Sequence, residues 1–453
     1  MKLHSLACAM MLAGLAGCAT YQSKPLDLHP TMLDAVPPHI TIDTSKMPLP
    51  ELRSHVFDPS HGLDMTDVAM LAVINNPDLK VARDDAHVSR AQAFAAGLLP
   101  EPQFSSEMDV PGPPVAGADS RAFNVGLSWD IGALLYQSKQ HEAAKLAAKQ
   151  TDLNLLWQEW QIVAQARVLF AQNVMDQQLL KVQKESQDLL RSRYDHTQEA
   201  LNKGLTTADI VMTDLTAVAA AESQVHTTEI DLNAKHSQLA ALLNLSPSVE
   251  LSLVGPAQLP VLDDAKVRAI LPDLASRRPD LLALKAGYES QDQTYRAAIL
   301  QQFPDFTIGI NRQRDTSDVY STGYVLNFNI PVNGNRGNIA VAVATRQKLY
   351  DDFESRYSAA NRDILAILRD EPLLQRQLRE ASEALTKLKD ASTHAQAAFE
   401  AGNLDELSYA TLRSGLLAKE IEVINLKESI LERHISLQTL IGSDLPIKTE
   451  TQD

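Results

Sequence analysis

Two stretches decide the fold of this chain: residues 204–245, GLTTADIVMTDLTAVAAAESQVHTTEIDLNAKHSQLAALLNL, and residues 402–443, GNLDELSYATLRSGLLAKEIEVINLKESILERHISLQTLIGS. Apolar residues recur at every seventh position of both: Val211, Val218, Val225, Leu232 and Leu239, then Tyr409, Leu416, Val423, Ile430 and Leu437. Each residue has its counterpart 198 positions further along (402 − 204 = 198). A sustained heptad is typical of helices that pack as a coiled coil. The sequence therefore predicts two equivalent long helices, each opened by a glycine turn, in a two-repeat protein.

The composition agrees with an extended helical protein. Only 5% of the 453 residues are aromatic, which is low for a globular chain and typical of long helical bundles. The formal net charge is −16 and no run of basic residues occurs. This charge argues against nucleic acid as a partner, because nucleic-acid binding needs clustered Lys and Arg.

The amino terminus indicates export and a lipid anchor. Lys2 precedes an apolar run from Leu6 to Gly17, which is too short to span a bilayer but suits a secretory signal. The run ends in Leu15-Ala16-Gly17-Cys18, the pattern of bacterial lipoproteins, so Cys18 is the predicted site of acylation, palmitate included. The alternative is an ordinary signal peptide with an incidental cysteine. Cys8 lies in the segment that would be removed, so no disulfide is expected.

Pro, Gly and Asn residues that interrupt the periodic stretches divide the chain into six predicted segments. They are a signal peptide (1–17), an N-terminal tether (18–63), a first repeat (64–245), a connector (246–265), a second repeat (266–443) and a C-terminal tail (444–453). Each repeat contains one long helix, about 133–202 or 336–401, and two shorter ones. On a rise of about 1.5 Å per residue, two short helices placed end to end match one long helix. Pro372, inside the second long helix, is expected to kink or interrupt it.

Each repeat also contains a predicted strand hairpin, at about 102–131 and about 304–331, where apolar and polar residues alternate. The clearest apolar series are Phe123, Val125, Leu127 and Trp129, and Tyr324, Leu326 and Phe328. Such strands suit a membrane barrel with an apolar outer face and a wet interior, which Glu107, Asp109 and Asp130 would line. Four strands cannot close, and an open edge in lipid leaves backbone groups unpaired. Closure would take two chains with eight strands or three with twelve. The alternative is a soluble sheet that caps a helical domain.

Three motifs together resemble the TolC family of outer-membrane efflux proteins. They are Asn76-Pro77-Asp78-Leu79 with Gly97-Leu98-Leu99-Pro100, Arg277-Arg278-Pro279-Asp280-Leu281 with Phe303-Pro304, and Pro331-Val332-Asn333-Gly334-Asn335-Arg336-Gly337. The resemblance implies a mainly α fold with a transmembrane β portion. The long helices would form a coiled-coil barrel, and trimerisation would complete a twelve-stranded β-barrel.

The same resemblance implies a function, a location and partners. The protein would be the exit duct of a tripartite efflux or secretion system, lipid-anchored in the outer membrane of a Gram-negative bacterium and extending into the periplasm. A homotrimer would dock through a periplasmic adaptor, or membrane fusion protein, onto an inner-membrane pump of the resistance-nodulation-division type. The alternative function is a non-conducting periplasmic coiled-coil lipoprotein that acts as an envelope scaffold.

The resemblance also assigns candidate residues. The glycine turns correspond to the tips where an adaptor docks: Lys203, Gly204, Leu205 and Thr206, and Gly402, Asn403 and Leu404. Family members often carry Asp beyond the second tip, where this chain has Ser408 and Thr411. The first repeat has Asp209 and Asp214, which are possible pore or gate residues. Asp209 is equally explained as a first-turn carboxylate that stabilises its helix.

The sequence contains no recognisable catalytic constellation. The histidines considered, from His87 to His434, are scattered on helices, and none pairs with another at four residues' distance. Nucleophile motifs such as Gly-x-Ser-x-Gly are absent. We therefore expect no enzymatic activity, no metal site and no cofactor other than the lipid on Cys18. The exported substrate cannot be read from the sequence.

Overall fold

The computed structural model describes residues 20–29, 32–38, 50–112, 120–255 and 263–442. The chain divides into two units, Met1–Leu33 and Asp34–Asp453. The described residues of the first unit form no helix. Cys18, the signal peptide and the C-terminal tail lie outside the described residues, so the expectations about them stay predictions.

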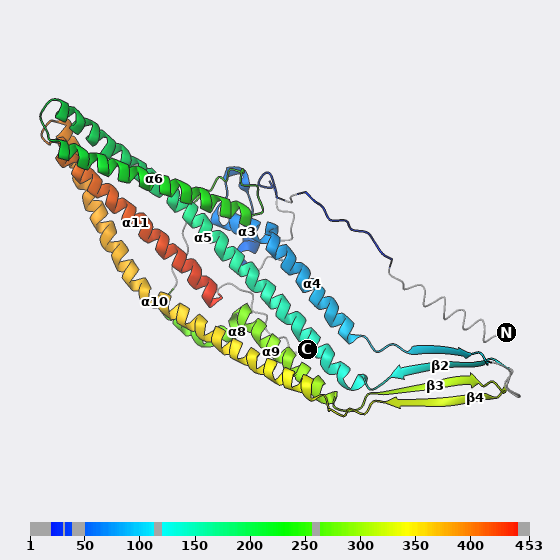
Figure 1. Cartoon of the computed structure of the whole chain (residues 1–453). Coiled ribbons are helices and arrows are strands. Elements are labelled where there is room, and N and C mark those ends of the chain that lie inside the picture. Colours follow the sequence, from blue (N-terminus) through cyan, green and yellow to red (C-terminus); the bar gives the residue numbers. More distant parts are fainter. Residues whose placement is uncertain (1–19, 30–31, 39–49, 113–119, 256–262, 443–453) are drawn as a thin grey trace. The chain divides into compact units, whose positions relative to one another are not determined.

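The second unit is mainly helical with one small sheet, which confirms the predicted fold class (Figure 1). The elements of the first half are α2 (Pro50–Ser54), η2 (Pro59–His61), α3 (Met65–Asn75), α4 (Pro77–Gly97), β1 (Gln103–Asp109), β2 (Ala122–Asp130), α5 (Leu134–Asn202) and α6 (Ala208–Leu242). Those of the second half are α7 (Asp264–Ile270), η3 (Leu271–Asp273), α8 (Leu274–Arg277), α9 (Pro279–Leu300), β3 (Phe306–Arg314), β4 (Tyr320–Phe328), α10 (Arg336–Glu400) and α11 (Glu406–Ile441).

Proline sets the start of the shorter helices in both repeats. Pro77 is the first residue of α4, where a missing backbone N–H removes no hydrogen bond. Asn76 caps this helix by accepting a hydrogen bond from the Leu79 backbone N–H at 3.0 Å. Its side-chain amide also donates to the Leu242 carbonyl oxygen at 3.2 Å, so the cap joins α4 to the end of α6. Pro279 begins α9 in the same way.

In each repeat the long helix packs against the two shorter ones. α5 contacts α4 and α6 along its length, and α10 contacts α9 and α11, as the helix lengths predict. The heptad positions are buried: Val211, Val218 and Val225 on α6, and Leu416 and Val423 on α11, are at most 4% exposed. α5 also packs against α9 and α11 of the second repeat, which the sequence did not indicate.

The largest buried cluster lies where α3, α5 and α6 meet α11. It contains Leu71, Phe170 and Leu243, each at most 1% exposed, and Ile435 from the second repeat. A second cluster joins α9, α10 and α11 through Leu281, Ile364 and Leu437. Burial of such side chains contributes about 1.5–3 kcal/mol each, so these clusters fix the helices at mid-length.

Pro372 does not interrupt its helix, so that part of the sequence-based expectation is wrong. α10 continues from Arg336 to Glu400 through the proline. Proline removes one backbone donor, but the helix is held from outside by side-chain contacts with α11. The neighbouring Glu371 carboxylate lies 2.8 Å from His434 Nε2 of α11 and accepts a hydrogen bond from Gln375.

The strands form one antiparallel sheet in the order β1-β2-β3-β4 (Figure 1). The two hairpins are joined by pairing of β2 with β3, from Phe123 opposite Arg314 to Asp130 opposite Thr307. β1 has seven residues and each of the other strands has nine. Both outer strands, β1 and β4, leave one edge unpaired within the described chain.

Candidate functional site

The sheet has one apolar and one polar face. In an antiparallel pair, directly opposed residues point to the same side, so the register assigns each side chain to a face. The apolar face contains Phe104, Met108, Phe123, Val125, Leu127, Trp129, Phe306, Ile308, Ile310, Tyr324, Leu326 and Phe328. The polar face contains Ser105, Glu107, Asp109, Asn124, Ser128, Asp130, Thr307, Asn311, Gln313, Ser321 and Asn327.

The apolar face is the more exposed of the two. Tyr324 is 89% exposed, Phe104 71% and Leu326 64%, whereas Thr307 and Asn311 on the polar face are half-buried. Water-soluble monomers rarely expose a contiguous apolar patch of this kind, which marks contact with a partner or a membrane. The sheet therefore presents its apolar side outward and its carboxylates, Glu107 among them, to the opposite side.

The two glycine turns have the same geometry. Gly204 follows α5 with φ of +71°, and Gly402 follows α10 with φ of +73°, a backbone conformation that favours glycine. The Gly204 N–H donates to the Leu201 carbonyl oxygen and the Leu205 N–H donates to the Ala200 carbonyl oxygen, both at 2.9 Å. This pair of bonds is the Schellman ending of a helix.

The second turn repeats these bonds. The Gly402 N–H donates to the Phe399 carbonyl oxygen at 2.9 Å, and the Asn403 N–H donates to the Ala398 carbonyl oxygen at 2.8 Å. Around the first turn, Lys203 pairs with Glu199 at 2.5 Å and Leu205 is 77% exposed. Thr206 and Leu404 are half-buried, and Gly402 and Asn403 are exposed.

Replacement of Gly402 by Ala should destabilise the protein by about 1 kcal/mol, because an L residue is strained at positive φ even where space is open. Gly415 is the matched control: it lies inside α11, has equally open space around an added Cβ, and has no positive φ. Gly415→Ala should stabilise the helix by about 0.5–1 kcal/mol. Thermal loss of the helical circular dichroism signal measures both. A Gly402→Ala variant as stable as Gly415→Ala would contradict the turn geometry.

Asp214 lies inside the first hairpin. Its side chain is 2% exposed, pairs with Arg193 at 2.6 Å and accepts a hydrogen bond from the Thr197 hydroxyl at 2.9 Å. A buried carboxylate with these partners joins α6 to α5 and has no free oxygen for a pore. In this subunit Asp214 is therefore a contact between helices, a role that the sequence alone did not indicate.

The other three gate candidates lie within the first two turns of their helices. Asp209 is exposed, and a hydrogen bond from the Thr207 side chain lowers the pKa of its carboxyl, so it is ionised. The Ser408 hydroxyl donates to the Asp405 carboxylate at 2.6 Å, as part of the cap of α11. The Thr411 hydroxyl donates to the Leu407 carbonyl oxygen at 2.7 Å. Asp209 is the one candidate of the four with an exposed charge.

Two contacts that the sequence does not reveal join the hairpins of the two repeats. His196 of α5 contacts the Glu406 carboxylate at the start of α11, and Arg413 of α11 contacts Glu185 of α5. The hydrogen bond with Glu406 raises the pKa of His196. The partners are separated by 210 and 228 residues in the chain, so no local pattern could have paired them.

A buried ion-pair cluster marks the junction between the repeats. The Arg278 guanidinium is 2% exposed, lies 4.8 Å from the ring of Trp157, and donates to both oxygens of Asp280 at 3.0 and 2.7 Å. It also donates to the Leu440 carbonyl oxygen at 3.1 Å, and Arg356 donates to Asp280 at 2.9 Å. Burial opposes ionisation of Asp280, but both guanidinium groups outweigh it and hold the pKa of that carboxyl below its ordinary value.

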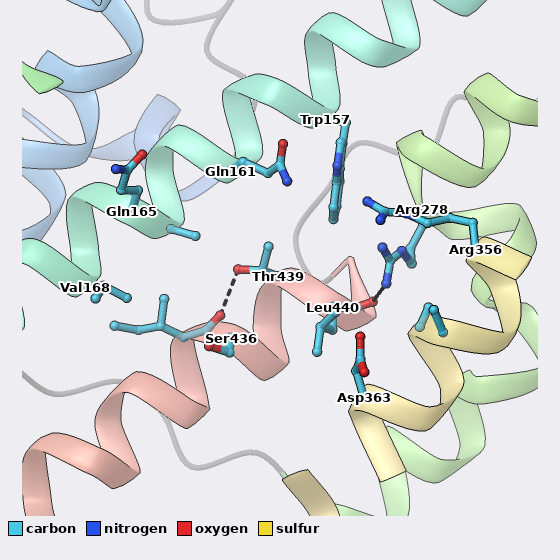
Figure 2. Close-up of a pocket in the computed structure, with 14 residues that line it drawn as sticks. Trp157, Gln161, Gln165, Val168, Arg278, Arg356, Asp363, Ser436, Thr439 and Leu440 are labelled. Atoms are coloured by element: carbon cyan, nitrogen blue, oxygen red, sulfur yellow. Dashed lines mark hydrogen bonds between the residues drawn. The ribbon is translucent and has the colours of Figure 1, made fainter. Parts of the chain in front are cut away.

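A cavity of about 400 Å³ adjoins this cluster (Figure 2). Trp157, Gln161, Gln165 and Val168 of α5 line one side and residues of α10 and α11 the other. The lining combines two guanidinium groups with Asp363 and the buried Asp280 nearby, so the charges nearly balance. Nothing in this arrangement provides a nucleophile beside a general base.

One group of possible metal ligands occurs among the described residues, and sequence reasoning missed it. His55 Nε2 lies 2.9 Å from Asp67 Oδ1 and 3.7 Å from Asp64 Oδ2. Asp64 also caps α3 by accepting hydrogen bonds from the backbone N–H groups of Thr66 and Asp67. Through these contacts the three residues hold the segment before α3 against that helix.

None of the described helices is long and apolar enough to cross a membrane.

The second repeat matches a family of known proteins. Residues 270–443 match the family model described as "Outer membrane efflux protein". No curated protein matches the chain. The matched family consists of transport proteins, which agrees with the expectation that the chain is not an enzyme.

Solved structures share the fold. The CmeC outer membrane channel of Campylobacter jejuni has a TM-score of 0.71 at 15% identity, over 85% of this chain and 87% of that chain. The outer membrane protein VceC of Vibrio cholerae has a TM-score of 0.68 at 15% identity, over 84% and 97%. The MtrE outer membrane channel of Neisseria gonorrhoeae has a TM-score of 0.67 at 17% identity, over 96% and 99%. These structures share the fold that the motifs led us to expect.

Proposed function

We propose that the protein is the exit channel of a tripartite efflux or secretion system in a Gram-negative outer membrane, since residues 270–443 match the outer membrane efflux protein family. Three copies would enclose the pore. Substrates would pass from an inner-membrane pump of the resistance-nodulation-division type, through a periplasmic adaptor, to the outside. No catalytic group is needed for this activity, because the work is done by the pump.

The observation that carries the proposal is the exposed apolar face of the sheet. Side chains such as Tyr324 and Leu326 are stable outward only if hydrocarbon replaces water around them. The opposite face carries Glu107, Asp109 and Asp130, which suit a water-filled lumen that tolerates cations. Because β1 and β4 each leave an open edge, neighbouring copies have to pair with both.

The internal repeat supports the same closure in the helical part. α5 packs against α9 and α11 of the second repeat. The equivalent contact of α10 would be with α4 and α6, but α10 has no comparable contact with either within the described residues. A neighbouring copy can supply it. Apolar side chains are exposed on α4 and on α10, among them Val81 and Phe94 on α4 and Val341 and Leu373 on α10.

Single-channel recording tests this function. The purified protein should have the molecular mass of three chains in detergent and should produce discrete conductance steps in planar bilayers. Twelve strands enclose a lumen wide enough for water, whereas eight are filled by side chains. A monomer that never conducts would exclude the channel and leave the periplasmic scaffold as the function.

The docking tips follow from this proposal. An adaptor would contact the two exposed glycine turns, at Lys203, Gly204, Leu205 and Thr206 and at Gly402, Asn403 and Leu404. Exposed Leu205 is the apolar anchor of the first turn. A photo-crosslinker at position 205 should capture the adaptor in cells, and one at Ile230 on α6, away from the tip, serves as a control. Equal capture at both positions would remove the tip as the docking site.

The lipid on Cys18 would be a second anchor beside the barrel. A Cys18→Ser variant should lose the mass of the acyl chains but remain in the membrane fraction. Release of the variant into the periplasm would mean that the barrel is not an anchor.

A further inference from the structure

We propose that the turn end of the sheet binds a lipid with a phosphate-bearing headgroup in the outer leaflet of the membrane. The inference rests on the proposed function, since it needs the apolar face to lie in lipid. The residues concerned are Arg312 and Arg314, near the end of β3. Both lie on the apolar face, because they pair with Val125 and Phe123 of β2.

Aromatic rings hold the two guanidinium groups at this place. The Arg314 guanidinium lies 5.4 Å from the ring of Phe123 and 5.9 Å from that of Tyr320, and the Arg312 guanidinium lies 5.8 Å from Tyr320. Phe123 and Tyr320 contact each other edge to face at 6.2 Å. Cations over aromatic faces are attracted by the ring quadrupole, so both side chains are positioned before any ligand arrives.

The positive charge is only partly balanced within the chain. Arg314 lies 3.4 Å from Asp318, which is 63% exposed, and its buried Nε has no hydrogen-bond partner. Arg312 donates to the Thr322 hydroxyl at 2.9 Å, and none of the described carboxylates pairs with it. The Arg314 guanidinium also donates to the Arg121 backbone carbonyl oxygen at 2.7 Å. The site therefore has donors left for an anion.

Apart from Asp318, two strand carboxylates lie at the same height, and both are on the other face. Asp109 pairs with Ala122 and Glu107 with Asn124, so both point to the polar face, away from the arginines. In a chain with a net charge of −16, this separation makes the turn end of the apolar face locally positive. An anionic headgroup is complementary to it, and arginine matches phosphate with two parallel hydrogen bonds.

An apolar hollow lies beside the arginines on the same face. It has a volume of about 550 Å³ and is lined by Leu127, Trp129, Ile308, Ile310, Tyr324 and Leu326. The lining residues nearest the β3–β4 turn are Ile310 and Tyr324, which pair with each other. Ile310 is two residues before Arg312, roughly 7 Å along the strand. A lipid can therefore place an acyl chain in the hollow while its phosphate contacts the arginines.

The depth of the arginines in the membrane is consistent with this assignment. A lipid-facing Arg is strongly destabilising at the midplane of the bilayer and nearly neutral near its surface. The arginine row is followed by the β3–β4 turn, and the opposite end of each strand leads to a helix. With the helices in the periplasm, the arginine row lies at the headgroups of the outer leaflet.

Native mass spectrometry of the purified protein with defined lipids tests the proposal. The probes are lipid A with two phosphates and its form with one phosphate, which have the same acyl chains. Wild-type protein should retain the two-phosphate lipid, and Arg312→Gln with Arg314→Gln should weaken retention at least about tenfold. Arg336→Gln, at the opposite end of the strands, is the matched control and should bind as wild type does.

The outcomes separate this inference from the proposed function. Conducting wild-type protein that retains both lipids equally would overturn the lipid site and leave the channel intact. Wild-type protein that does not conduct would overturn the channel itself. If the double variant fails to assemble, the comparison of the two lipids on wild-type protein still decides the matter.

Discussion

Leu326→Arg should abolish assembly of the protein in the membrane. Leu326, the seventh of the nine residues of β4, lies on the apolar face, pairs with Ile308 and is 64% exposed. A lipid-facing arginine at mid-depth costs about 2–4 kcal/mol, and every copy in an assembly would carry one. We expect a loss of at least about tenfold in assembled protein, measured as the oligomer recovered from outer-membrane fractions.

Asn327→Arg is the matched control for this substitution. Asn327 is the next residue of β4, pairs with Thr307 and lies on the polar face. An arginine there would face water in the lumen, so assembly should remain near the wild-type level while ion selectivity shifts towards anions. Equal recovery of the two variants would show that the apolar face is not in lipid.

Asp280→Asn should be the most destabilising change in the helical part. The substitution leaves the Arg278 guanidinium, which is 2% exposed, without its charged partner and also removes the ion pair with Arg356. Breaking a buried ion pair by removing one partner costs about 3–5 kcal/mol, because the remaining charge stays desolvated. The free energy of unfolding, followed by the helical circular dichroism signal in denaturant, measures this loss.

Asp292→Asn is the control for burial. Asp292 also pairs with two arginines, Arg296 at 2.9 Å and Arg346 at 2.8 Å, but its side chain is 20% exposed, compared with 8% for Asp280. Solvent screening should limit its loss to about 1 kcal/mol. Losses of equal size would mean that burial is not the reason for the effect.

The lowered pKa of Asp280 makes the stabilisation by its ion pairs depend on pH. Its folded-state pKa is lowered from the ordinary value of an aspartate, so the folded protein holds this proton less tightly than the unfolded chain does. The stabilisation is therefore complete above the unfolded pKa of about 3.9 and is lost as the pH falls through the folded value. Asp280→Asn should remove this component of acid sensitivity, which denaturant titrations at pH 7 and below pH 4 would measure.

Sequence patterns anticipated the local features of the fold. The heptads identified the buried stripe of α6 and α11, the alternation identified both faces of the sheet, and the glycines identified two turns with positive φ. These features depend on side-chain period and backbone sterics, which neighbouring residues set among themselves. Pro372, by contrast, lies in a continuous helix because contacts with α11 support it.

The sequence by itself determined which residues form helices and strands, which side of each is apolar, and that one chain leaves a sheet open at both edges. Tertiary structure alone decided which elements meet: α5 with α9 and α11, Arg278 with Trp157, and His196 with Glu406. It also decided that Asp214 is buried while Asp209 stays exposed. The physical reason is that a periodic apolar stripe specifies the direction in which a helix must pack. It does not specify the partner, because many stripes in this chain are chemically alike and only the complete set of contacts selects among them.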